Sequence, residues 1–220
     1  LLIGKTSYAT ASALVRFYPV LADSISSQIS KDSIIVRKCW VKIIPKYILG
    51  DASLPFDFNL YRIKQSWSST EINNNNYKSL PVDKSNDISF NRSITDTLIT
   101  FNIENSIALK WLQNKVDTAK GENYGVMFSP TESTNRIIGI LGLNYYTDYS
   151  DFTVYIEVEK IGKYIDTVKA FTTEDLHVVE VNLPHSSTNN LILTGGDPYR
   201  AKLFFDLSSL PKNVIINKAV

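Results

Sequence analysis

The chain has 220 residues, of which 23 are basic and 22 acidic, giving a formal net charge of +1. Because these charges are spread without blocks, the sequence lacks the dense basic face that nucleic-acid binding requires. A hydrophobic content of 44% is enough to build a full core, while no apolar run reaches the length of a membrane span. These features predict a folded protein with no nucleic-acid partner and no membrane span.

Aromatic and small polar residues dominate the rest of the composition. Twelve tyrosines, ten phenylalanines and many Ser, Thr and Asn residues favour β-sheets with polar outer faces. The single cysteine, Cys39, rules out an internal disulfide. It alternates in phase with Val41 and Ile43, which predicts a buried, inert thiol.

Strands are predicted wherever apolar and polar residues alternate. In chain order they cover residues 14–18, 38–43, 56–63, 98–103, 124–128, 136–143, 152–159, 178–183 and 199–207. The segment from Ser24 to Ser33 and the Asn-rich segment at 68–91 are predicted as loops. Prolines fall between these runs or at their ends, where a missing backbone donor is tolerated.

One helix is predicted at about residues 107–116, where Trp111 and Leu112 lie on an apolar face and Asn105 and Ser106 can cap the start. The elements together predict an all-β fold, an antiparallel β-sandwich of jelly-roll type with one short helix. The predicted core contains Val15, Phe17, Cys39, Val41, Ile43, Trp111, Val154 and Ile156.

The end of the chain repeats its beginning. Ala13 to Phe17 corresponds to Ala201 to Phe205, and the offset is 188 at Phe17 and 180 at Lys38, which corresponds to Lys218. A repeat at this distance suggests tandem modules. We expect one module at 1–160, whose first strands lie upstream, and the beginning of a second, incomplete module at 161–220. Residues from about Tyr164 onward should either pack against the open sheet of the first module or depend on sequence outside this chain.

Several phrases resemble the DNRLRE domain family, which is also treated as a carbohydrate-binding module family. Residues 201–211 read Ala-Lys-Leu-Phe-Phe-Asp-Leu-Ser-Ser-Leu-Pro, Ala13 to Phe17 gives a first copy, and residues 122–128 read Glu-Asn-Tyr-Gly-Val-Met-Phe. The chain departs from the family pattern at Phe204, where the family has arginine, and at Tyr18-Pro19, where it has Asp-Leu. The resemblance implies an extracellular, non-catalytic accessory module, often in tandem, in surface or polysaccharide-associated proteins.

The residues offer few groups for catalysis. His177 and His185 are expected to face solvent, and two histidines are too few for a zinc site. Glu157 and Glu159 lie roughly 7 Å apart on one strand face. Glycoside cleavage can use such a pair, but an exposed polar face produces the same spacing routinely. We therefore expect no enzymatic activity.

Aromatic side chains are the better candidates for function, because the apolar faces of sugar rings stack on them. The candidate carbohydrate-binding residues are Trp40, Trp67, Tyr145, Tyr146 and Tyr149. Trp40 shares the parity of Lys38 and Lys42 and is expected on the outer face. There it would either form a platform for a sugar or be covered by a loop or a neighbouring module.

A loop that carries Asp148 and Asp151 could supply oxygen ligands to calcium, the one cofactor that the sequence suggests. Taken together, these patterns predict a non-catalytic extracellular module, secreted or at a bacterial cell surface, that binds polysaccharide or mediates adhesion. The alternative is a purely structural repeat of a surface layer, stalk or filament, whose partners are neighbouring copies of the module and whose strands exchange between subunits.

Overall fold

A computed structural model describes residues 1–143, 151–160, 162 and 164–181. By its internal contacts the chain divides into a unit of Leu1–Leu183 and a unit of Pro184–Val220. The second unit, which includes the strand predicted at 199–207, lies outside the described residues. The division falls after Leu183, whereas the repeat in the sequence suggested a boundary at residue 160.

The first unit is mostly antiparallel β-structure, as the alternation in the sequence predicts. Its elements are β1 (Leu2–Lys5), β2 (Ala9–Val20), α1 (Asp23–Ser30), β3 (Ile34–Ile43), β4 (Pro45–Leu49), β5 (Phe58–Ile63), the 3-10 turn η1 (Tyr77–Ser79), β6 (Val82–Asp83), β7 (Ser89–Ile94), β8 (Ile99–Ile103), α2 (Asn105–Val116), β9 (Val126–Pro130), β10 (Ile137–Ile140), β11 (Phe152–Lys160) and β12 (Tyr164–Val181). The all-β class is confirmed, and the jelly-roll connectivity stays a prediction.

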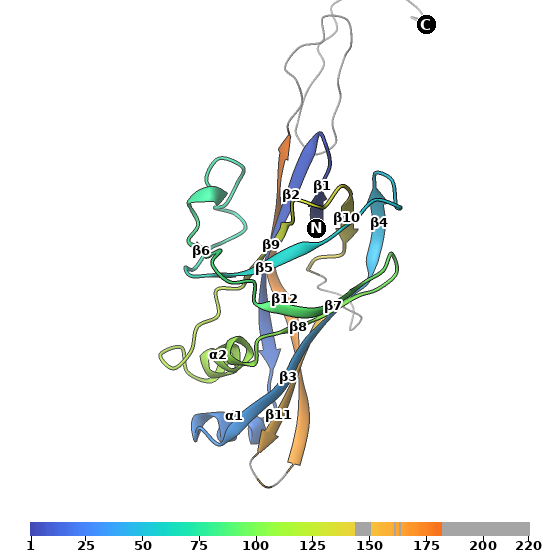
Figure 1. Cartoon of the computed structure of the whole chain (residues 1–220). Helices are drawn as coiled ribbons and strands as arrows, with labels where there is room; N and C mark the ends of the chain where they lie inside the picture. The colour runs from blue at the N-terminus through green and yellow to red at the C-terminus, as the bar shows by residue number, and fades with distance from the viewer. Residues whose placement is uncertain (144–150, 161, 163, 182–220) are drawn as a thin grey trace, which may run out of the picture. The chain divides into compact units, whose positions relative to one another are not determined.

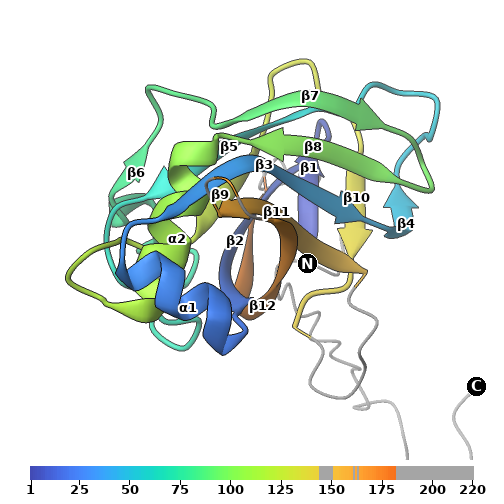
Figure 2. The same ribbon diagram turned by 90° about the horizontal axis from the view of Figure 1, so that it is seen from below.

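The strands form two layers that join at β2. The main path runs β4-β10-β1-β2-β12-β11-β3-β8-β7, while β9 pairs with β2 and β5 pairs with β9 as a side branch. The branch packs on the main path: the rings of Phe58 in β5 and Phe101 in β8 have centroids 5.3 Å apart, and those of Phe128 in β9 and Phe152 in β11 are 5.7 Å apart. Figure 2 shows β7, β8, β3 and β11 side by side in the layer that these rings face. The fold is therefore a sandwich.

The core between the layers contains the residues that parity predicts. Each of the following exposes 2% or less of its surface and belongs to one cluster: Val15, Phe17, Cys39, Val41, Ile43, Trp111, Val154 and Ile156. Phe17 packs against Trp111 at 5.6 Å and against Phe152 at 5.2 Å between ring centroids. The predicted core is confirmed, because a strand that buries one face must place alternate residues on it.

β12 lies inside the sheet rather than beyond it. Residues 164–171 pair with β11, and residues 169–181 pair with β2. This strand therefore joins β2 to β11, as the orange and dark blue ribbons in Figure 1 show. Residues 164–181 therefore pair with strands of residues 1–160, while the two alternatives for the later residues stay predictions.

Two helices lie together at one side of the strands, where the sequence predicted one (Figures 1 and 2). α2 is the predicted helix, but its N-cap residue is Glu104, without a side-chain cap bond. α1 occupies the predicted loop. Half of its residues are serines, which are weak helix formers, yet Ile25 and Ile29 are one turn apart and both buried. In the described part of the chain, no helix has the length and apolar character that crossing a membrane requires.

The side branch is buried on both faces. Its outer side carries a second cluster formed by Leu14, Ile63, Trp67, Leu80, Met127 and Val178. The segment at 64–81 covers this cluster, and the side-chain amide of Asn74 donates to the carbonyl of Val179 at 3.1 Å. The predicted loop at 68–91 therefore has a structural role as a cover over the outer face of β2 and β9.

Candidate functional site

The outer face of the main layer carries a row of side chains that are neighbours in register. The row consists of Phe90, Asn102, Trp40, Tyr155, Lys169 and Val20, one from each of β7, β8, β3, β11, β12 and β2. We call these six residues the outer row. Neighbouring strands lie about 4.8 Å apart, so the outer row extends for roughly 24 Å. Such a length suits an extended ligand.

Trp40 and Tyr155 form the centre of the outer row. Their ring centroids are 5.2 Å apart and their planes differ by 12°, so the rings stack on one another. The ammonium group of Lys38 lies 5.2 Å from the centroid of the Trp40 ring. Trp40 thus lies on the outer face, where parity predicts it. Because the rings stack face to face, a ligand would meet their free faces and edges rather than one flat platform.

Apolar and polar groups flank this ring pair. Phe90 is 46% exposed and Val20 is 58% exposed at the two ends of the outer row. Asn102 and Lys169, the register neighbours of the two rings, add an amide and an ammonium group. Ring faces beside hydrogen-bonding groups suit a ligand that presents both apolar C–H surface and hydroxyl groups.

A second row lies beside the first. It consists of Thr100, Lys42, Thr153, Phe171 and Tyr18, again one from each successive strand. Thr153, in the middle of this row, is buried. Tyr18 ends this second row and is 46% exposed. The ammonium group of Lys115 in α2 lies 3.8 Å from the centroid of the Tyr18 ring and donates to its hydroxyl. The second row therefore ends at an aromatic side chain whose position a helix residue fixes.

Trp67 has a different role from the one that the sequence suggested. It is only 4% exposed, and its Nε1 donates to the carbonyl of Tyr124 at 2.7 Å. The guanidinium group of Arg16 lies over its ring, 5.7 Å from the centroid. The assignment of Trp67 to the sugar-binding surface is thus corrected: apolar side chains on the outer face of β2 and β9 need a cover, and Trp67 anchors that cover.

Four of the remaining candidates, Tyr145, Tyr146, Asp148 and Tyr149, lie outside the described residues, so their sugar-binding and calcium-binding roles stay predictions. Asp151 is described, and its carboxylate pairs with the ammonium group of Lys46 at 2.7 Å. Among the described residues, no group of three or more His, Cys, Asp or Glu side chains is arranged to hold a metal ion. Asp151, the described residue of the predicted calcium site, is therefore already paired with Lys46.

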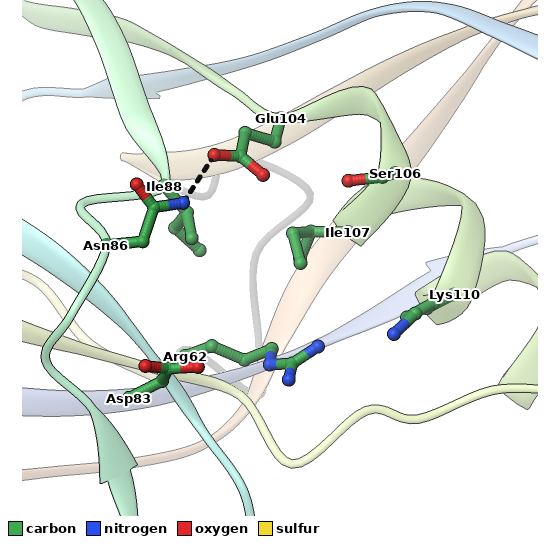
Figure 3. A pocket seen from close by; sticks show the side chains of 8 residues that line it. All are labelled: Arg62, Asp83, Asn86, Ile88, Glu104, Ser106, Ile107 and Lys110. Carbon is green, nitrogen blue, oxygen red and sulfur yellow. Dashed lines mark hydrogen bonds between the residues drawn. The ribbon is translucent and has the colours of Figure 1, made fainter.

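A pocket of about 270 Å³ lies between β5, β6 and the first turns of α2 (Figure 3). Its lining consists of Arg62, Asp83, Asn86, Ile88, Glu104, Ser106, Ile107 and Lys110. In Figure 3 Arg62 and Lys110 point toward one another across the pocket, and on the opposite side Asn86 donates to Glu104 at 2.7 Å. Cations and carboxylates are both present, so the lining does not select strongly for either sign of charge.

The protein itself engages the carboxylates of this pocket. Asp83 accepts a hydrogen bond from the Ser85 hydroxyl at 2.6 Å and pairs with Lys64 at 2.9 Å. These interactions lower the pKa of Asp83 to about 2. A glycosidase needs one carboxyl group with a raised pKa as its acid, and Asp83 is ionised throughout the neutral range. Asp83 is therefore suited to hydrogen bonding and not to proton donation.

Glu159, Cys39 and His177 are three further titratable groups that were considered for catalysis. The carboxylate of Glu159 is hydrogen-bonded by Arg37, which lowers its pKa. Burial raises the pKa of the Cys39 thiol to about 12, so the thiolate is scarce at neutral pH. His177 lies exposed on β12. Desolvation lowers the pKa of His177. The raised pKa of Cys39 and the lowered pKa of Glu159 are opposite to those that a nucleophilic thiol and a carboxylic acid catalyst need.

Sequence reasoning missed the neighbours of Trp40. Alternation places Tyr155 outward with Thr153 and Glu157, but the sequence does not show that β11 lies beside β3. Phe90 belongs to the outer row because β7 pairs with β8, and Tyr18 belongs to the second row because β2 pairs with β12, a strand far from it in the chain. Parity is a local property, whereas register depends on tertiary packing.

In comparisons with known proteins, no family model, curated protein or solved structure matches this chain. The resemblance to the DNRLRE family consequently rests on the phrases quoted from the sequence.

Proposed function

We propose that this protein is a non-catalytic module that binds polysaccharide along the outer row, in a secreted or cell-surface protein. The observation that carries the proposal is the stacked pair of Trp40 and Tyr155 on the outer sheet face. Aromatic rings offer apolar surface to the C–H faces of sugar rings, and Lys38, Asn102 and Lys169 offer hydrogen bonds to the hydroxyl groups.

The shape of the surface supports a chain-like ligand. Both rows cross strands β8, β3, β11, β12 and β2, so their residues are spread over several strands, whereas single small ligands prefer enclosed sites. A polysaccharide can contact several strands at once and gain affinity from many weak contacts. The resemblance to the DNRLRE family points in the same direction.

A non-catalytic role agrees with the electrostatics of the acidic groups. Arg37 holds Glu159 in its charged form, and Ser85 and Lys64 do the same for Asp83. Binding modules need no activated group. The proposal is therefore recognition of polysaccharide, with cleavage left to other proteins.

The test compares the full chain with Trp40→Ala and Tyr155→Ala in affinity electrophoresis through gels that contain neutral or charged polysaccharides. Each variant should weaken binding by about tenfold, the effect of losing roughly 1.4 kcal/mol of contact. Tyr8→Ala is the matched control, because Tyr8 is an aromatic residue that is 62% exposed outside both rows. Circular dichroism verifies that all variants stay folded.

Two outcomes would count against the proposal. Binding that both ring variants leave unchanged would place the ligand elsewhere on the molecule. A chain that binds no polysaccharide but self-associates with increasing concentration in analytical ultracentrifugation would favour the structural repeat instead.

A further inference from the structure

A second pocket, of about 320 Å³, opens where the second row ends at Tyr18. Its lining includes Arg16, Tyr18, Asn114, Asn123, Thr173 and Glu174. We call it the β2–β12 pocket, since both strands contribute to it. Nothing in the sequence pattern pointed to these residues as a group, because they come from β2, α2, the segment before β9, and β12.

The pocket forms where β2 and β12 change register. Thr172 pairs with Phe17 and Glu174 pairs with Arg16, which leaves Thr173 as an extra residue on β12. Such a bulge interrupts the ladder and redirects side chains. Asn123 fills part of the interruption, because its Nδ2 donates to the carbonyl of Phe17 at 2.6 Å. The hydroxyl of Thr173 donates to the carbonyl of Arg16 at 3.3 Å.

One hydrogen-bond acceptor in this pocket lacks a partner. Asn123 Oδ1 is buried and has no hydrogen-bond partner among the described residues. Leaving a buried acceptor unpaired costs free energy, so nearly all such atoms in proteins are satisfied. Asn123 lines the pocket, so this unsatisfied acceptor lies in the pocket wall, beneath the surface that a ligand would touch.

The charges of the pocket balance internally. Arg16 and Glu174 form an ion pair, and each is only partly exposed. Glu174 also accepts a hydrogen bond from the backbone of Ser69 at 2.6 Å, and Arg16 donates to the carbonyl of Trp67 at 3.1 Å. Since Arg16 and Glu174 neutralise one another, neither is free to bind an ion, which favours a neutral ligand.

We propose that the β2–β12 pocket binds the hydroxyl groups of one neutral sugar residue of a polysaccharide that follows the second row, an inference that rests on the proposed function. A sugar hydroxyl can donate to the hydroxyl oxygen of Thr173, whose own hydrogen is engaged by the carbonyl of Arg16. The ring of Tyr18 offers apolar surface at the mouth. From Trp40 to Tyr18 there are three strand spacings, roughly 15 Å, so an oligosaccharide can contact both and a single sugar cannot.

The experiment titrates the ¹⁵N-labelled full chain with neutral glucan and mannan oligosaccharides, and with polygalacturonate oligomers as an anionic comparator. The side-chain amide signals of Asn123 and Asn114 report on the pocket, that of Asn102 reports on the outer row, and that of the exposed Asn135 is the control. A neutral oligosaccharide should shift the first three signals and leave Asn135 in place.

A pair of variants tests the contact in the pocket. Thr173→Val removes the hydroxyl while it keeps the shape, and should weaken the binding of the neutral oligosaccharide by about fivefold to tenfold. Thr167→Val, at an exposed position of the same strand outside the pocket, should leave binding unchanged. Asn123 itself is left intact, because its bond to Phe17 supports the fold.

The outcomes separate the two proposals. Shifts at Asn102 without shifts at Asn123 and Asn114 would overturn the pocket assignment and leave polysaccharide binding in place. Larger shifts of the pocket signals with polygalacturonate than with neutral sugars would overturn the neutral ligand class. If no oligosaccharide moves any of the three signals, the proposed function fails and the pocket assignment falls with it.

Discussion

Phe17 and Tyr18 are adjacent in β2 and have opposite roles. Phe17 is buried against Trp111 and Phe152, while Tyr18 is 46% exposed and lines the β2–β12 pocket. Side chains alternate between the two faces of a strand, so one residue stabilises the core and its neighbour lines the pocket. For this pair the sequence is informative, because parity alone places Phe17 on the apolar face and Tyr18 on the opposite face.

Phe17→Ala should therefore lower the free energy of unfolding by roughly 3–5 kcal/mol, through lost contacts and the cavity that remains. Urea denaturation measures the change. Val20→Ala is the control on the same strand, because Val20 is 58% exposed and its replacement should cost about 0.5 kcal/mol or less. Equal effects of the two changes would contradict the inward position of Phe17.

Cys39 should resist thiol reagents in the folded protein. Its pKa is raised from 9.0 to about 12 by burial, so its contribution to stability is fully present below about pH 9 and is lost as the pH rises toward 12. Ellman's reagent at pH 8 should label the urea-unfolded chain at once and the native chain only as fast as it unfolds. Rapid labelling of the native chain would show that the thiol is accessible.

Among the elements, those with strong local patterns could be predicted and those held by packing could not. The alternation in β3, β8 and β11 and the helical spacing around Trp111 identify their elements directly. α1 was missed because its serines favour a loop. Ile25 and Ile29 stabilise the helix only by packing against the rest of the fold, which the local sequence does not show. The burial of Trp67 was missed for the same reason, since a cover can be recognised only together with the face that it covers.

Gly125, just before β9, is a position where only glycine fits without strain. Gly125 has φ +87°, and a Cβ atom at this position would lie 2.3 Å from the carbonyl oxygen of Val15. Gly125→Ala should lower the free energy of unfolding by roughly 2–4 kcal/mol, from backbone strain plus the collision with β2.

Gly162→Ala is the matched control for this effect, measured by the same denaturation. Gly162 also has a positive φ, +72°, but apart from its two chain neighbours no described residue has an atom within 4 Å of the position of its Cβ. Only the strain of about 1 kcal/mol should appear. If both variants lose the same stability, the close approach of Gly125 to Val15 has no energetic weight.

For the whole molecule, the decisive feature is that β12 joins β2 to β11. The sequence repeat shows that two segments are similar, but it does not show which strands pair, because pairing is set by the three-dimensional packing of both faces. A boundary at 160 would therefore remove the strand on which the two neighbours depend, whereas a boundary after Leu183 leaves the sheet intact.

Truncation tests this boundary. A chain of residues 1–183 should keep the near-ultraviolet circular dichroism and the cooperative unfolding of the full chain. A chain of residues 1–160 should lose both, because β2 and β11 lose their shared partner and much of the core becomes exposed. Cooperative unfolding of the 1–160 chain would show that β12 is dispensable.

The place of β12 also sets an order of events during synthesis. β2 leaves the ribosome early, but the strand with which it pairs along its whole length follows only at residues 169–181. Contacts between such distant segments form slowly, and until they form the edges of β2 and β11 can pair with other chains. The sheet can close only after nearly all of the first unit has been made, so folding follows translation of this unit rather than accompanying it, and the growing chain needs protection from aggregation until then.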